Sequence, residues 1–180
     1  MLGVRPGPSR VLEEDVSTED LAAARLARVL QRVTEPMTGA VVNRAGVLAG
    51  GVGVVEFAPP PVRPEHEDQS SRTRWRFEIY NSAWRLQSVT EVLAGSGDSV
   101  DLARAALAGL RGSLLSRIAV RVPALETVLD FGEVELRLFP QYTGPDDSFR
   151  YWSLTVPSGE TLSVGPGLRI SSTLDDRVEP

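Results

Sequence analysis

The most regular alternation of apolar and polar residues lies in residues 151–167, which read YWSLTVPSGETLSVGPG. Trp152, Leu154 and Val156 alternate with tyrosine, serine and threonine, and this period of two is typical of a half-buried strand. A Pro-Ser-Gly-Glu turn follows, and the alternation resumes at Leu162. The segment therefore predicts a β-hairpin with one buried face.

Two other segments have the period of an amphipathic helix. Residues 18–34 begin at an S-x-x-D capping signature and are followed by Pro36 and Gly39, which end helices. A second helix is expected after Ser99, with its end at Gly112. The apolar positions are spaced three or four residues apart. They are Leu26, Val29, Leu30 and Val33 in the first helix, and Ala103, Ala106, Leu107 and Leu110 in the second.

The remaining apolar positions alternate as strands. Short strands are expected within residues 40–57 and within residues 118–138. Trp75, Phe77 and Ile79 form a further alternating run, followed by a predicted turn at residues 80–83 and a return strand from Trp84. The segment from Trp75 onward therefore predicts a second Trp-led hairpin.

Helix, strands, proline-containing loop and Trp-led hairpin occur in this order twice. Leu26-Ala27-Arg28 recurs as Leu102-Ala103-Arg104, residues 51–59 align with residues 132–140, and Trp75 aligns with Trp152. The pattern predicts an α+β fold of two tandem helix-plus-antiparallel-strand units. We expect this internal duplication to pack around a shared core with pseudo-twofold symmetry, with Trp75 and Trp152 as equivalent core anchors.

The expected boundaries follow from the proline-, glycine- and charge-rich segments. We predict a flexible arm at 1–16, a first unit at 17–93 with a mobile loop at 58–74, a second unit at 94–170 and a disordered tail at 171–180.

Composition limits the possible chemistry of this 180-residue chain. Cysteine is absent and all nineteen basic residues are arginine, which excludes thiolate, disulfide and lysine chemistry. The net charge is −5 and no arginine stripe is present, so we expect no nucleic-acid partner. No apolar run approaches the roughly 20 residues that span a bilayer, and no signal peptide is evident, so we expect a cytoplasmic protein without a membrane partner.

Candidate catalytic groups are isolated. His66 is the only histidine, Ser96 lacks the rest of a nucleophile elbow, and Gly50-Gly51 precedes no helix that could hold a phosphate. The carboxylates of Asp146-Asp147, or of Asp130 and Glu133, would need to face each other to act as an acid–base pair, and turn formation explains them better. We predict no catalytic residue, metal or cofactor.

The first Trp-led segment differs from the second by its polar and aromatic residues. Tyr80, Asn81, Trp84 and Arg85 lie at or beside the predicted turn, where residues 157–161 of the second copy are a plain Pro-Ser-Gly turn. Tyr, Trp and Arg are enriched at protein-binding hot spots, so these four residues are the predicted partner-binding site. The alternative for Trp84, a place in the core beside Leu86, stays equally open.

The second half also resembles a known group of proteins. Arg137-Leu138-Phe139-Pro140, then Tyr151-Trp152-x-Leu154 and Pro157-Ser158-Gly159, and a final Val164-Gly165-Pro166-Gly167 are the residues that carry the resemblance. Over roughly residues 100–167 the chain is similar to small actinobacterial proteins of unknown function whose Trp-led hairpin closes the domain. Some of these proteins are encoded beside polymorphic toxins, so the resemblance implies an immunity-type role and no catalytic motif.

Two functional hypotheses result. The first is a non-enzymatic bacterial protein-binding module, either an immunity or antitoxin-type factor or a subunit of a larger assembly, that binds another protein. The second is a small-ligand or carbohydrate-active domain that uses tryptophan and carboxylate side chains in a cleft between the two units.

Overall fold

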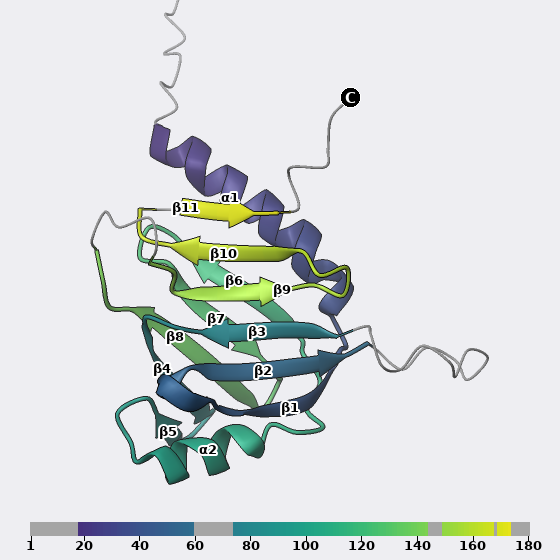
Figure 1. The fold of residues 1–180 in the computed structure, drawn as a ribbon, viewed down its shortest axis with the longest axis vertical. Coiled ribbons are helices and arrows are strands. Elements are labelled where there is room, and N and C mark those ends of the chain that lie inside the picture. Colours follow the sequence, from purple (N-terminus) through teal and green to yellow (C-terminus); the bar gives the residue numbers. More distant parts are fainter. Residues whose placement is uncertain (1–17, 60–73, 144–148, 168, 174–180) are drawn as a thin grey trace, which may run out of the picture.

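The computed structural model describes residues 18–59, 74–143, 149–167 and 169–173, and these form a mixed α+β fold with two antiparallel sheets (Figure 1). The predicted α+β class is therefore confirmed. The predicted arm at 1–16 and residues 60–73 of the predicted loop lie outside the described residues. Within the described part, no helix has the length and apolar character needed to cross a membrane.

All neighbouring strands in both sheets are antiparallel. The six-stranded sheet has the order β1 (Val41–Val47), β2 (Gly53–Ala58), β3 (Trp75–Ile79), β9 (Trp152–Thr155), β10 (Thr161–Gly165), β11 (Arg169–Ser172). The five-stranded sheet has the order β5 (Val92–Gly95), β4 (Ser82–Ser88), β8 (Val134–Pro140), β7 (Glu126–Asp130), β6 (Arg117–Arg121).

The two predicted helices are present. α1 (Thr18–Thr34) has the predicted bounds and runs behind β10 and β11, and the short 3-10 turn η1 (Glu35–Met37) follows it (Figure 1). α2 (Val100–Ala108) lies at the opposite end of the molecule, and the Ser99 hydroxyl accepts a bond from the Leu102 N–H as an N-cap. It ends at Ala108 with Gly109 as its C-cap, about one turn before the predicted end at Gly112. A second 3-10 turn, η2 (Ala49–Gly51), joins β1 to β2.

The predicted hairpin at residues 151–167 is confirmed, because β9 and β10 pair with each other. The predicted hairpin that begins at Trp75 is wrong. β3 pairs with β2 and β9, whereas β4 pairs with β5 and β8 in the other sheet. At Tyr80 and Asn81 the chain passes from one sheet to the other. Alternation shows which face of a strand is buried and does not show which strand is its neighbour.

Backbone hydrogen bonds also join the segment that follows α1 to the segment that follows α2. Val41 and Leu114 form an isolated antiparallel bridge. On its two sides, four backbone hydrogen bonds of 2.8–2.9 Å link residues 39–42 to residues 112–115. The two sheets are therefore joined by main-chain bonds as well as by side-chain packing.

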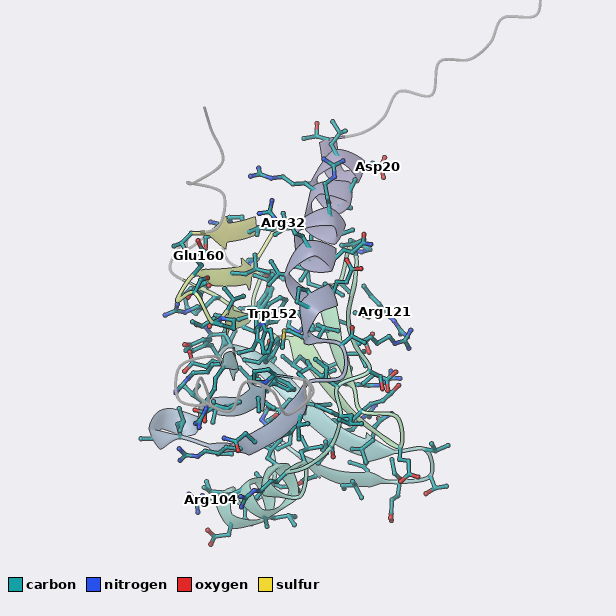
Figure 2. All side chains as sticks on the ribbon, turned by 90° about the vertical axis from the view of Figure 1, so that its right-hand side faces the viewer. Asp20, Arg32, Arg104, Arg121, Trp152 and Glu160 are labelled. Atoms are coloured by element: carbon teal, nitrogen blue, oxygen red, sulfur yellow. The ribbon has the colours of Figure 1, made fainter. Side chains whose placement is uncertain are left out.

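One core fills the space between the sheets. Trp152 is 1% exposed and stacks on Phe77 with ring centroids 5.0 Å apart. Its indole N–H donates to the hydroxyl of Thr127 on the opposite sheet at 2.9 Å. Figure 2 shows Trp152 near the centre of the molecule, beside the lower end of α1. A buried indole needs such a partner, so this bond fixes the two sheets relative to each other.

The predicted boundaries are only partly reflected in the sheets. Strands from both sides of the predicted boundary between residues 93 and 94 occur in each sheet. Ser171 and Ser172, expected in a disordered tail, belong to β11 and pair with β10. Residues 174–180 lie outside the described residues.

Candidate functional site

The four residues of the predicted partner-binding site do not form one surface. Trp84 is 5% exposed and belongs to the core, where it lies opposite Leu138 of β8. A partner could contact its ring only if the protein unfolded locally. The alternative that the sequence left open for Trp84, a core position, is therefore the observed one.

Arg85 lies on the outer face of the five-stranded sheet, away from the other predicted site residues. Its guanidinium is 5.4 Å from the centre of the Phe139 ring, and its buried Nε has no hydrogen-bond partner among the described residues. Directly opposite lies Arg137, which pairs with Glu135 and Glu126. The hydrogen bond to Glu135, ahead of the charge of Glu126, raises the pKa of Arg137. Arg85 therefore belongs to a charged sheet face and not to a turn.

Tyr80 and Asn81 lie together with a residue that the sequence did not single out. The guanidinium of Arg150 is 4.5 Å from the centre of the Tyr80 ring, which is cation–π range. The Tyr80 hydroxyl donates to Glu78, and the Asn81 side-chain amide donates to the Arg150 carbonyl at 3.0 Å. These contacts hold the chain before β9 against the crossing between the two sheets. We call Tyr80, Asn81 and Arg150 the crossing cluster.

The backbone just before β9 passes closely over the end of β10. The carbonyl oxygen of Phe149 lies 2.6 Å from the point that a Cβ atom would take on Gly165. The Tyr151 N–H donates to the Val164 carbonyl at 2.7 Å, which keeps the two segments together. Only glycine allows this approach, because any side chain would collide with main-chain atoms.

The segment before β9, with Phe149 and Arg150, forms one wall of a groove of about 550 Å³ on β10 and β11. Its lining consists of Phe149, Arg150, Ser163, Gly165, Arg169, Ile170 and Ser171. We call it the β10–β11 groove. It combines two guanidinium groups and two hydroxyl groups with apolar walls, and the described residues of its lining include no carboxylate or histidine. Such a set can bind an anionic group but offers no acid–base pair.

Arg150 is the exposed cation of this groove. Arg76, on the same sheet, forms ion pairs with Glu56 at 3.2 Å and Glu78 at 2.9 Å. For Arg150, no carboxylate of the described residues lies within ion-pair distance, and its charge faces the groove and the Tyr80 ring. Arg169 is oriented by a bond from its Nε to the Pro166 carbonyl at 3.0 Å.

A second hollow of about 560 Å³ lies beside the N-terminal part of α1. Its lining includes Ala22, Ala23, Val122 and Pro123, and among the described lining residues Asp20 is the one charged side chain. Figure 2 shows Asp20 at the far end of α1. This hollow has fewer groups that could select a ligand than the β10–β11 groove.

The catalytic candidates have structural roles or lie outside the described residues. His66 and Asp146-Asp147 are outside them. Ser96 accepts a bond from the Trp84 N–H at 3.2 Å, and Asp130 accepts bonds from Gly132 N–H and Arg117. No three potential metal ligands cluster within the described part of the chain.

Tyr151 is expected to make the stability of the fold depend on pH. Its phenol is buried and donates to the Tyr142 carbonyl, and burial raises its pKa. Because the folded pKa lies above the unfolded value of about 10, the stabilising contribution is complete below about pH 10. It is lost as the pH rises through the folded pKa. We therefore expect the stability advantage of the wild type over Tyr151→Phe, measured by urea unfolding, to shrink above about pH 10.

The sequence missed the groove residues Arg150, Ser163, Arg169 and Ser171. Ser163 and Ser171 are ordinary polar positions of alternating strands, and only the pairing of β10 with β11 places them opposite each other. Arg150 precedes a Trp-led strand, as a solvated turn residue would. No local pattern marks such residues as a group.

No protein-family model, curated protein or solved structure matches this chain. The assignment of function therefore depends on the geometry described above.

Proposed function

We propose that this protein is a non-enzymatic protein-binding module, and that the crossing cluster and the β10–β11 groove are its contact surface. The observation that carries the proposal is the position of Arg150, an exposed guanidinium stacked on Tyr80 at the mouth of a groove. Arginine and tyrosine are the residue types most enriched among binding hot spots. The stack restricts the arginine before a partner arrives, which reduces the entropy lost on binding.

The environment of the tryptophans favours this proposal over a carbohydrate-active domain. A sugar site of that kind needs an exposed aromatic ring for stacking and a carboxylate for hydrogen bonds. Trp75, Trp84 and Trp152 are 8%, 5% and 1% exposed, and no carboxylate lines the groove among the described residues. The predicted small-ligand function thus has less support than protein binding.

Two kinds of binding module fit the surface, as the sequence predicts. An immunity or antitoxin-type factor would cover the active site of a toxin, and a subunit of a larger assembly would hold a neighbouring chain. The resemblance that the sequence suggests for residues 100–167 is to actinobacterial proteins of which some are encoded beside toxins, and it would favour the first. A toxin gene beside this one would favour it further.

Site-specific photo-crosslinking in the native host tests the proposal. A photoreactive residue replaces Asn81 or Ser171 at the proposed surface, or Arg104 on α2 at the far end of the molecule (Figure 2). We expect one adduct of the same mass from Asn81 and Ser171 and none from Arg104. Excess unlabelled wild type should compete, and the Arg150→Gln variant should compete poorly. Equal adducts from all three positions, or none from the first two, would reject this surface.

We also propose that the chain is an internal duplication with pseudo-twofold symmetry. The strand orders support this. Suppose that α1 with β1–β5 corresponds to α2 with β6–β10, strand by strand. Replacing each strand of the order β1-β2-β3-β9-β10 by its counterpart then gives β6-β7-β8-β4-β5. This is the strand order of the other sheet. Among the described strands, β11 is the one without a counterpart.

The backbone bonds around the Val41–Leu114 bridge also support the duplication, because they occur as two matched pairs. Gly39 N donates to Leu115 O and Gly112 N to Val42 O, both at 2.8 Å, and Val42 N donates to Ser113 O and Leu115 N to Ala40 O, both at 2.9 Å. A twofold rotation that exchanges the two segments converts each bond into the other bond of its pair, as at an isologous contact.

The residues themselves give further support. In this alignment Val54-Val55-Glu56-Phe57 corresponds to Val128-Leu129-Asp130-Phe131, and Trp84-x-Leu86 corresponds to Trp152-x-Leu154. Phe57 and Phe131 stack on each other with centroids 6.4 Å apart, as equivalent residues beside a twofold axis would. The proposed counterpart of Trp152 is thus Trp84, whereas the sequence alone suggested Trp75.

A further inference from the structure

The β10–β11 groove lies beside a free strand edge. β11 is the last strand of the six-stranded sheet, and within the described residues it pairs with β10 alone. The Thr173 N–H donates to the Thr161 carbonyl, so residues 171 and 173 direct their backbone groups toward β10. By the alternation of an antiparallel ladder, the N–H and C=O groups of Ile170 and Ser172 face away from it. An edge of this kind can accept another strand.

We propose that an extended, carboxylate-rich segment of the partner protein binds as an added strand along β11, with its acidic side chains in the β10–β11 groove. The proposal rests on the proposed function and names the chemistry that the same surface recognises. The backbone groups of Ile170 and Ser172 would supply affinity, and the guanidinium groups would supply specificity.

The charge of the groove favours a segment with acidic side chains. Arg150 and Arg169 lie in one groove, and none of the described residues that line it is acidic, although the chain as a whole has a net charge of −5. The hydroxyl groups of Ser163 and Ser171, which are paired across β10 and β11, add hydrogen-bond donors. A carboxylate fits such donors in charge and in geometry, with arginine as a bidentate partner.

The geometry of an added strand favours a segment whose acidic residues occupy alternate positions. In an added strand, every second side chain would point to the groove side of the sheet, and these side chains recur at intervals of about 7 Å. A peptide with glutamate at alternate positions would thus place its carboxylates in a row above Ser171 and beside the two arginines. A continuous acidic run would leave half of its charges on the opposite face.

Peptide binding to the full chain tests this inference. The probe is a fluorescein-labelled octapeptide of alternating glutamate and valine, and its matched control has glutamine in place of glutamate. Fluorescence anisotropy at fixed salt gives the dissociation constants. We expect the glutamine peptide, and the Arg150→Gln variant with the glutamate peptide, each to bind about tenfold more weakly, as for one lost charge-assisted hydrogen bond.

Two further variants separate the contributions. Arg44→Gln removes the same charge from β1, the opposite edge of the same sheet, and should change the affinity less than about twofold. Ser172→Pro removes an N–H that faces away from β10, so it should abolish binding while the urea unfolding midpoint stays close to that of the wild type. If Ser172→Pro does shift the midpoint, a probe N-methylated at alternate amides replaces it and should bind about tenfold more weakly than the unmodified probe.

The opposite results would overturn the inference. Equal losses in Arg150→Gln and Arg44→Gln would indicate unspecific charge attraction. Undiminished binding by Ser172→Pro and by the methylated probe would indicate an anion site without strand addition. A more than tenfold gain on removal of residues 174–180, which contain Asp175, Asp176 and Glu179, would make the chain's own tail the occupant. A crosslinked partner at Asn81 together with no peptide binding would reject this inference alone, whereas loss of the crosslink would reject the proposed function.

Discussion

Trp152→Ala is expected to lower the free energy of unfolding by about 3–5 kcal/mol, a large part of the 5–15 kcal/mol typical of a domain. The ring is 1% exposed, stacks on Phe77 and binds Thr127 across the core. The substitution leaves a cavity and a buried hydroxyl without its donor, and both effects destabilise the fold. Urea unfolding followed by circular dichroism measures the change.

Two comparisons refine this prediction. Trp152→Phe keeps an aromatic ring but removes the indole N–H, so a double-mutant cycle with Thr127→Val isolates the bond between the sheets at about 1 kcal/mol. Trp84→Ala should cost nearly as much as Trp152→Ala if the two residues are equivalent under the proposed duplication. A loss for Trp84→Ala much below that of Trp152→Ala would contradict this equivalence.

Gly165→Ala is expected to have the second-largest effect, about 1–3 kcal/mol of destabilisation together with loss of binding at the β10–β11 groove. The added Cβ would lie 2.6 Å from the Phe149 carbonyl oxygen, so residues 149–151 would have to move away from β10. That movement would displace Arg150 from Tyr80. Urea unfolding gives the stability, and the anisotropy assay gives the loss of peptide affinity.

Gly46→Ala is the matched control for this substitution. Gly46 is also a strand residue of the six-stranded sheet, but a Cβ atom there would meet no heavy atom within 4 Å. We expect Gly46→Ala to leave both the unfolding free energy and peptide binding close to those of the wild type. Equal destabilisation by both substitutions would show that loss of strand glycine, and not the contact with Phe149, causes the effect.

The candidate site was only partly predictable because its residues come from three separate segments. Tyr80 and Asn81 were chosen for residue type, and the structure places them beside Arg150, about 70 residues later in the chain. Arg85 differs by only a few positions from Asn81, yet it belongs to the other sheet. The chain enters β4 directly after Asn81, so residues close in sequence contribute to different surfaces.

Most of the helices and strands, and the faces they bury, were predictable from the order of the residues alone. The bounds of α1, the Ser99 cap, the hairpin at 151–167 and the α+β class follow from local periods and capping residues, which act within a few positions of the chain. Only the tertiary structure decided that β3 and β4 part into different sheets, that Trp84 is buried, and that Arg150 and Arg169 share a groove. Strand pairing depends on contacts between segments that are distant in sequence. The local pattern of apolar residues does not specify these contacts.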